Sequence, residues 1–159
     1  FDAAASMILG HHISSFEGQG PMALEALAEG VHPAVTLPLV TDNKGILRTD
    51  WAPLLPFLGN AGIPAPERAG IFHESMAVAL VDQALHIRRE QPFDAIGLTG
   101  GVLQNRYLTE RVVALLEQQG IEARLHERIP ANDGGLCFGQ VIEAAAIQQQ
   151  EISECRTAT

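Results

Sequence analysis

The sequence predicts an α/β fold in which a helix joins two parallel strands and further helices pack around them. Residues 95–98 form a short apolar segment typical of a buried strand, and residues 121–126 are a second strand candidate. Between them, leucines and valines recur on one face of a helix predicted over 105–119. A strand–helix–strand unit of this kind is right-handed in nearly all proteins, so the two strands are expected to run parallel.

A glycine-rich turn follows each predicted strand. Thr99-Gly100-Gly101-Val102 follows the first, and residues 130–135 follow the second. Ligands in open α/β sheets bind at the carboxyl edge of the strands, which is where both turns are expected. Gly100 and Gly101 allow the backbone to approach a phosphate closely, and each turn opens into a helix N-terminus whose free N–H groups attract phosphate. Asp133 would bring a carboxylate to the same edge, for a metal or a sugar hydroxyl.

The same turns also have a purely structural interpretation. A Gly-Gly pair after a strand can simply change the direction of the chain, and short motifs of this kind are weakly specific. Two such turns on adjacent strands, one of them carrying an acidic residue, favour the ligand-binding interpretation.

The composition describes a globular domain and argues against several classes of partner. With 159 residues, 47% of them hydrophobic, and a mean hydropathy of +0.11, the chain can form one sizeable domain. Its net charge of −9 argues against nucleic acid as a direct partner, since Lys and Arg hold phosphate backbones. No apolar segment is long enough to span a membrane. The two cysteines, Cys137 and Cys155, make no disulfide framework, which predicts a cytoplasmic protein.

The remaining elements are predicted from periodicity, caps and turn residues. Helices are expected over 1–9, 22–28, 51–58 and 66–89 and from Leu136 onward, with a β-hairpin over 34–48. The last eleven residues are polar and aperiodic, which predicts a domain of residues 1–148 followed by a disordered tail over 149–159. Because the chain begins without Met and inside a predicted helix, we expect it to be the C-terminal part of a longer chain.

Five short motifs carry a family resemblance. They are Phe1-Asp2-Ala3, Phe16-Glu17-Gly18-Gln19, Phe72-His73, Gly100-Gly101-Val102-Leu103-Gln104-Asn105-Arg106 and Pro130-Ala131-Asn132-Asp133-Gly134-Gly135-Leu136. In this order and spacing they resemble the C-terminal region of the HypF family, the carbamoyltransferases of NiFe-hydrogenase maturation. The resemblance covers almost the whole chain except the tail, and the last two motifs together are specific.

The resemblance implies a fold and an activity. The fold is the actin/hexokinase/Hsp70-like ATPase fold, of which this chain would be the second lobe, with a mixed sheet and packed helices. The family uses carbamoyl phosphate and ATP to make a carbamoyl-adenylate. The carbamoyl group then passes to the C-terminal cysteine of the partner protein HypE, where it becomes a cyanide ligand of the iron.

The resemblance also implies residue roles. The Gly-Gly-Val turn and the asparagine after it bind nucleotide in such proteins, and these positions fall on Gly100, Gly101 and Asn105. The acid of the Phe-Asp pair contacts ribose in tRNA-modifying relatives, which falls on Asp2. The glycine loop near the nucleotide falls on Gly18. No catalytic residue is assigned.

Asp133 falls where the relatives have an acidic metal ligand, so ATP and a divalent metal (Mg, Zn or Fe) are the implied cofactors of the full-length protein. The family's other metal ligands, two histidines four residues apart on a helix, and its first phosphate loop do not occur in this sequence. We therefore expect the fragment to be inactive alone. The alternative is a non-catalytic α/β interaction lobe, or a sugar-kinase-like ATPase lobe, in which the glycine turns are only structural.

Overall fold

The computed structural model describes residues 1–157, with side chains described through residue 150. The chain divides into two compact units. The first comprises Phe1–Ile96 and Asn105–Ala123, and the second comprises Gly97–Gln104 and the chain from Arg124 onward.

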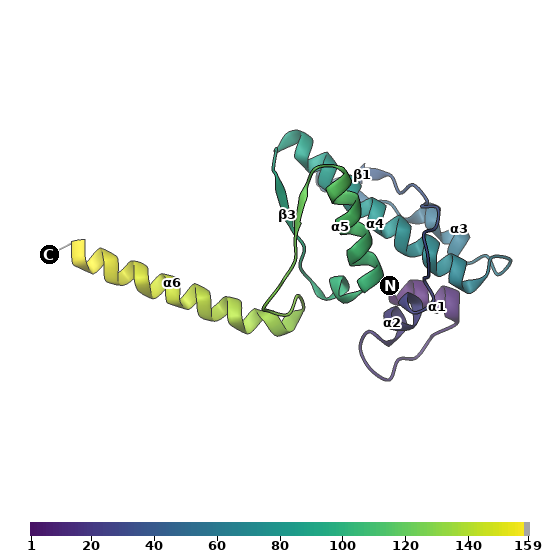
Figure 1. The fold of residues 1–159 in the computed structure, drawn as a ribbon, viewed down its shortest axis with the longest axis horizontal. Helices are drawn as coiled ribbons and strands as arrows, with labels where there is room; N and C mark the ends of the chain where they lie inside the picture. The colour runs from purple at the N-terminus through teal and green to yellow at the C-terminus, as the bar shows by residue number, and fades with distance from the viewer. Residues whose placement is uncertain (158–159) are drawn as a thin grey trace. The chain divides into compact units, whose positions relative to one another are not determined.

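The central helix of the first unit is α4, which spans Ala65–Glu90 and begins and ends within one residue of the predicted helix. Four other helices contact it (Figure 1). They are α1 (Asp2–Leu9), α2 (Gln19–Glu25), α3 (Leu55–Leu58) and α5 (Arg106–Gln118). A 3-10 turn, η1 (Ala52–Leu54), leads directly into α3, so the helix predicted over 51–58 is present in two pieces.

The core of the first unit is mainly aliphatic, because the chain carries only 5% aromatic residues. Phe72 is the largest fully buried side chain, and its ring meets that of Phe1 edge to face with 4.9 Å between centroids. Each fully buried side chain of this size contributes about 1.5–3 kcal/mol from removal of its surface from water. The other core members are Ala4, Ala5, Ile8, Leu24, Ala28, Leu37, Leu54, Leu58, Ala69, Ile71 and Ala79.

The amphipathic pattern of α5 places its apolar residues against α4. Leu108, Val112 and Leu116 recur every fourth residue and are each 1% exposed. This spacing puts them on one helix face, as the sequence predicts. Gly120 follows the helix with a φ of 65°, in the left-handed region that glycine adopts without strain.

Arg68 is a buried cation that joins three helices. Its Nη1 donates to the carbonyl oxygen of Leu58 at 2.8 Å, and its Nη2 donates to that of Ile8 at 3.4 Å. Leu58 ends α3 and Ile8 lies in the last turn of α1, so the guanidinium meets the negative ends of two helix dipoles. The charge of Arg68 therefore holds α1 and α3 to α4.

The predicted hairpin is present with shorter strands, β1 (Leu39–Thr41) and β2 (Leu47–Thr49), which pair antiparallel with Val40 opposite Arg48. Asp42 organises its turn. One carboxylate oxygen accepts from the backbone N–H groups of Lys44 and Ile46, each at 2.9 Å, and the other pairs with Arg48 Nε at 2.7 Å. The bond to Arg48, followed by the two backbone bonds, lowers the pKa of Asp42.

The two strands predicted on either side of α5 also pair. They are β3 (Ala95–Gly97) and β4 (Glu122–Arg124). Glu122 N donates to Asp94 O at 3.0 Å, and Leu98 N donates to Arg124 O at 2.9 Å. The bonded residues advance in the same direction on both strands, so the pair is parallel, as predicted.

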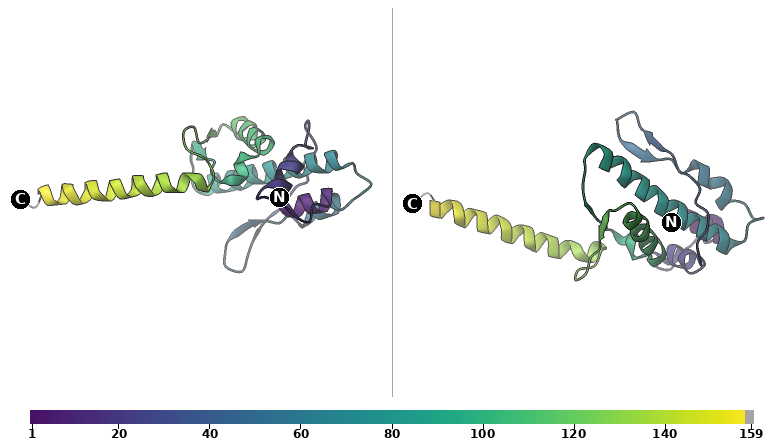
Figure 2. Two further views of the ribbon diagram at one scale, coloured as in Figure 1. Left: turned by 90° about the horizontal axis from the view of Figure 1, so that it is seen from below. Right: turned by 45° about the horizontal axis from the view of Figure 1, so that its top comes forward.

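The second unit contains the two glycine turns and the last helix. Its elements are η2 (Gly101–Gln104), η3 (Asp133–Gly135) and α6 (Leu136–Thr157). Figure 2 shows α6 as one uninterrupted helix in both views. It carries several exposed apolar side chains, among them Leu136 and Val141.

Two expectations differ from this structure. The resemblance implied one mixed sheet, whereas the described strands form two separate pairs, β1 with β2 and β3 with β4. The reason is that each three-residue strand hydrogen-bonds only to the partner that its own turn or crossover brings beside it. The helix expected over 22–28 lies instead at Gln19–Glu25. The disordered tail over 149–159 stays a prediction: α6 is assigned over Leu136–Thr157, and residues 158 and 159 lie outside the described residues.

None of the helices in the described part of the chain combines the length and the apolar composition that a membrane crossing requires.

Candidate functional site

The residues predicted to form a site divide between the two units. Gly100, Gly101 and Asp133 belong to the second unit. Asp2, Gly18 and Asn105 belong to the first.

The second unit brings the two glycine turns together, as their places after parallel strands predict. Gly100 N donates to the carbonyl oxygen of Ala131 at 2.8 Å, which ties the first turn to the second. His126 Nε2 lies 2.9 Å from Thr99 Oγ1 and adds a side-chain contact between the same segments. Gly100 has a φ of 111°, and a Cβ built there would meet no atom within 4 Å, so the backbone is open to a ligand.

Asp133 occupies an exposed position at the start of η3. The residue before it, Asn132, caps this turn, because its Oδ1 accepts from Gly134 N at 3.0 Å. A Cβ built on Gly101 would lie 3.7 Å from Asn132 Cβ, an ordinary packing distance. The asparagine therefore shapes the turn, and the adjacent carboxylate faces solvent.

Asp2 and the glycine loop also approach each other, within the first unit. Asp2 is the first residue of α1, and Gly18, with a φ of 83°, precedes α2. Gly20, in the first turn of α2, lies so close to α1 that an added Cβ would be 3.1 Å from Ala5 Cβ and 3.5 Å from Asp2 Oδ1. The structure thus places the Asp2 carboxylate beside the start of α2.

Asn105 is the N-cap of α5, and both the oxygen and the nitrogen of its carboxamide have hydrogen-bond partners. The side-chain Oδ1 accepts from Leu108 N at 2.8 Å, which is the usual N-cap bond. The Nδ2 group lies 2.9 Å from Nε2 of His73 on α4. Asn105 is 8% exposed, so only a small part of its side chain reaches the surface.

The first turn of α5 does not offer free N–H groups, which corrects the expectation from sequence. The carboxylate of Glu25, at the end of α2, accepts from Arg106 N at 2.6 Å and from Tyr107 N at 3.2 Å. Together with the Asn105 cap, this occupies the first three N–H groups of the helix. A carboxylate already lies where a phosphate would bind, so this N-terminus is not a phosphate site.

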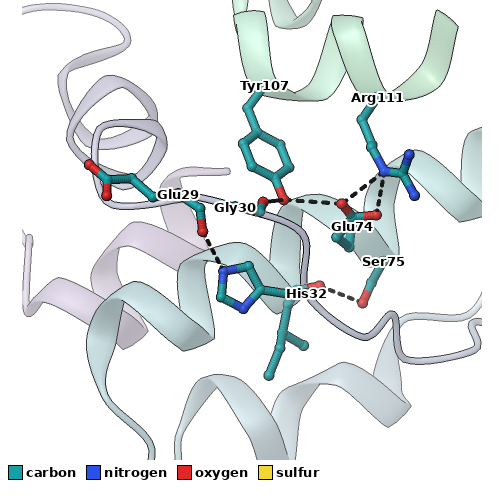
Figure 3. Close-up of polar contacts among 8 residues, drawn as sticks. Glu29, Gly30, His32, Glu74, Ser75, Tyr107 and Arg111 are labelled. Carbon is teal, nitrogen blue, oxygen red and sulfur yellow. Dashed lines mark hydrogen bonds and ion pairs between the residues drawn. The ribbon is translucent and has the colours of Figure 1, made fainter. Parts of the chain in front are cut away.

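A buried polar cluster between α4 and α5 is the main feature that sequence reasoning missed (Figure 3). Glu74, 2% exposed, receives two bonds of 2.9 Å from Arg111 Nε and lies 3.1 Å from the Tyr107 hydroxyl. That hydroxyl donates to Gly30 O at 2.6 Å. The sequence held one signal for this cluster. Glu74 is a charged residue within an apolar helix face, directly after Phe72 and His73.

Burial and the neighbouring carboxylate shift two pKa values in this region. Burial, then the charge of Glu74 and the hydrogen bond to it, raises the pKa of Tyr107 to about 12. Burial also lowers the pKa of His73, while its bond to Ala69 O and the charge of Glu25 partly oppose this. Both side chains are therefore neutral at neutral pH.

A family comparison identifies the relatives of this arrangement. Residues 1–140 match the model of the family described as "Carbamoyltransferase, Kae1-like Domain, second subdomain". The chain belongs to this family. It is a subdomain of the HypF carbamoyltransferases, as the five sequence motifs indicated.

Individual HypF proteins show the same relationship. The chain is 38% identical to the carbamoyltransferase HypF of Rhodobacter capsulatus over 147 residues, which is 92% of this chain and 19% of that protein. It is 32% identical to HypF of Rhizobium leguminosarum bv. viciae over 161 residues, 99% of this chain and 21% of that protein. The chain thus spans about one fifth of the length of these relatives.

Two HypF crystal structures are similar to this fold. Full-length HypF in the phosphate- and nucleotide-bound form matches 92% of this chain and 20% of its own, with a TM-score of 0.82 and 30% identity. HypF of T. kodakarensis matches 94% of this chain and 19% of its own, with a TM-score of 0.76 and 20% identity, which shows the fold alone. The first of these HypF proteins therefore binds phosphate and a nucleotide, and a nucleotide is the ligand that the sequence motifs predict.

The HypF resemblance also implied a metal, and the residues present do not fit one. Among the described residues, no three His, Cys, Asp or Glu side chains are grouped so that they could hold a metal ion. Transition-metal sites in proteins take three or more such ligands, whereas Asp133 would supply a single carboxylate. The carboxylate of Asp133 therefore provides one exposed negative charge at this turn.

A separate apolar cavity of about 530 Å³ lies in the first unit of this HypF subdomain, between the hairpin and α4. Phe1, Leu47, Trp51, Phe72 and Met76 are among its lining residues. None of the predicted nucleotide or metal residues lines it. The cavity is therefore distinct from the predicted site.

Proposed function

We propose that this chain is the nucleotide-binding second lobe of a HypF-type carbamoyltransferase with the actin/hexokinase/Hsp70-like ATPase fold. The longer enzyme uses carbamoyl phosphate and ATP, through a carbamoyl-adenylate. It carbamoylates the C-terminal cysteine of a HypE-like protein in cyanide-ligand synthesis for NiFe-hydrogenase, and it acts in the cytoplasm. The observation that carries this proposal is the match to HypF in its phosphate- and nucleotide-bound form, at 30% identity and a TM-score of 0.82.

Each proposed residue has a physical reason for its role. Gly100 and Gly101 present backbone without side chains, and Gly100 has open space beside its Cα, so a nucleotide phosphate or sugar can approach the peptide groups. Asn105 retains one Nδ2–H and one Oδ1 lone pair after its bonds to His73 and Leu108, and it uses these for the nucleotide. Asp2 accepts from a ribose hydroxyl, and Gly18 keeps the loop beside it open.

A specific observation favours the second candidate, a non-catalytic interaction lobe or a sugar-kinase-like ATPase lobe. The N-terminus of α5 is closed by Glu25 and Asn105, and both side chains have a full structural reason to be there. In that case the glycine turns connect elements and bind nothing.

The deciding experiment uses a chimeric enzyme. In it, this chain replaces the matching fifth of Rhodobacter capsulatus HypF, to which it is 38% identical. The measurement is carbamoyl transfer to the C-terminal cysteine of HypE, with a thermal melt to confirm folding. We expect the chimera to transfer the carbamoyl group. A folded chimera without transfer would contradict the proposal.

Two matched substitutions then test the second glycine turn. Asp133→Asn keeps the size of the side chain and removes its charge, and we expect at least a tenfold loss of transfer, or about 1.4 kcal/mol. The melting temperature should stay unchanged, because Asp133 is exposed. Asp94→Asn is the control, since Asp94 is also exposed and contributes a backbone carbonyl that asparagine retains. Normal transfer by the Asp133 variant would leave the turn as structure only.

A further inference from the structure

We infer that His73 is a positioning residue for the nucleotide site and that it acts by fixing the orientation of the Asn105 carboxamide. This inference rests on the proposed function, in which Asn105 contacts the nucleotide. His73 is fully buried on α4, and Asn105 is the N-cap of α5. The contact joins two residues 32 positions apart in the sequence.

The tautomer of His73 follows from its partners. Nδ1 lies 2.8 Å from the carbonyl oxygen of Ala69, one turn earlier on α4. A carbonyl oxygen can only accept, so Nδ1 carries the hydrogen and donates it. A neutral imidazole has one N–H, and Nε2 is therefore a lone-pair acceptor that faces Asn105.

The orientation of Asn105 follows from the same logic. Nε2 of His73 accepts from Nδ2 at 2.9 Å, and Oδ1 accepts from Leu108 N at 2.8 Å. The reversed carboxamide would place oxygen against the Nε2 lone pair and N–H against the Leu108 N–H, so both bonds would be lost. One chain of hydrogen bonds thus runs from Ala69 through His73 and Asn105 to Leu108.

The surroundings of His73 keep its ring in place and neutral. Its ring centroid lies 5.2 Å from that of Tyr107, 5.4 Å from that of Phe72 and 5.7 Å from that of Phe1. The Glu25 carboxylate acts on this ring and favours the cation. Burial has the largest effect and favours the neutral ring.

Protonation of His73 would disrupt the site. An imidazolium would carry an N–H at Nε2, which would face the N–H of Asn105 at a distance of 2.9 Å. The carboxamide would then turn away, and the nucleotide would lose its contact with Asn105. Nucleotide affinity should therefore weaken as the pH falls through the lowered pKa of His73.

Two variants separate this role from packing. His73→Phe keeps an aromatic ring against Phe1, Phe72 and Tyr107 but removes the acceptor. His73→Gln loses the ring, but its amide oxygen can take the place of Nε2 and accept from Asn105. Neither variant titrates. Asn105→Ala, in parallel, measures the contribution of the carboxamide itself.

The test has two parts. In the 159-residue chain, ¹⁵N NMR of the His73 ring should find the Nδ1–H tautomer, and an Nε2–H tautomer would overturn the inference. In the chimeric HypF described above, loss of one buried hydrogen bond should raise the KM for ATP roughly five- to tenfold in His73→Phe, with a smaller change in kcat. His73→Gln should stay within about twofold of the unsubstituted chimera and lose the pH dependence of KM below pH 6.5, the ordinary pKa of histidine.

The remaining outcomes separate failure of this inference from failure of the proposed function. If His73→Phe keeps the KM of the unsubstituted chimera, or if His73→Gln is impaired as strongly as His73→Phe, His73 does not position Asn105 for the nucleotide. If Asn105→Ala itself leaves KM unchanged in an active chimera, the nucleotide role of Asn105 is wrong and His73 supports only a helix cap.

Discussion

Gly70, in the second turn of α4, lies so close to His32 that no residue with a side chain fits there unless His32 moves. A Cβ built on Gly70 would overlap Cδ2 and Nε2 of the His32 ring. That ring is held by its bond to Glu29 O at 2.7 Å (Figure 3). The absence of a side chain at Gly70 therefore lets His32 pack closely against α4, although glycine lowers the stability of the helix itself.

Gly70→Ala should destabilise the chain by about 1–3 kcal/mol, because displacement of His32 outweighs the gain of about 1 kcal/mol in helix propensity. In a His32→Ala background the ring is gone, so the same substitution should be neutral or stabilising. The measurement is a double-mutant cycle by urea denaturation. Equal effects in the two backgrounds would show that the His32 contact is not responsible.

The raised pKa of Tyr107 predicts that the folded state becomes less stable at alkaline pH. Its pKa is raised to about 12 in the folded state from an ordinary value of 10.0, so the unfolded chain loses its proton first as the pH rises. The contribution of Tyr107 is therefore full below pH 10 and disappears between pH 10 and about 12. Tyr107→Phe, which has no proton to lose, should show a shallower fall of melting temperature over this range, and parallel curves would exclude the effect.

At the scale of elements, α5 depends on three side chains from other helices. Glu25 of α2 accepts from two of its first N–H groups, and His73 of α4 holds the Asn105 cap. At its other end, Arg88 of α4 donates from Nη1 to Gln119 O at 3.0 Å. The helix is thus fixed at both termini by contacts outside its own sequence.

Glu25→Ala should cost about 1–2 kcal/mol, because it leaves the N–H groups of Arg106 and Tyr107 without the carboxylate. Hydrogen exchange at these two amides should become faster than at Val112, in the middle of the helix. Glu29→Ala is the control, since this nearby acid contributes its backbone carbonyl and an exposed side chain. Unchanged exchange in Glu25→Ala would mean that the cap adds nothing in solution.

At the scale of the whole molecule, the chain corresponds to about one fifth of its HypF relatives. The resemblance implies a nucleotide that lies between two lobes, and one lobe supplies only part of its contacts. The chain also has a net charge of −9, which repels a polyphosphate.

We therefore expect the 159-residue chain to bind ATP no more tightly than the millimolar range, roughly −4 kcal/mol. Isothermal titration calorimetry at low ionic strength tests this directly. Micromolar affinity would contradict the view that the remainder of the site lies outside this chain. A titration with the chimeric HypF provides the positive control.

Much of the secondary structure could be predicted from the sequence alone. The bounds of α4, the end of α1 at Gly10, the hairpin around Asp42 and the parallel pairing of β3 with β4 all agree with the predictions. These features depend on residues close together in the sequence, through apolar periodicity and turn chemistry. The family resemblance depended on short motifs for the same reason, and the family match confirmed it.

Only the tertiary structure decided how those motifs are used. The Glu25 carboxylate accepts from the first N–H group of α5, 81 residues away in the sequence. His73 on α4 contacts Asn105 at the start of α5. The described strands form two separate pairs and not one mixed sheet. Contacts between distant residues leave no periodic pattern in a single sequence, because nothing in their spacing records which side chains meet after folding.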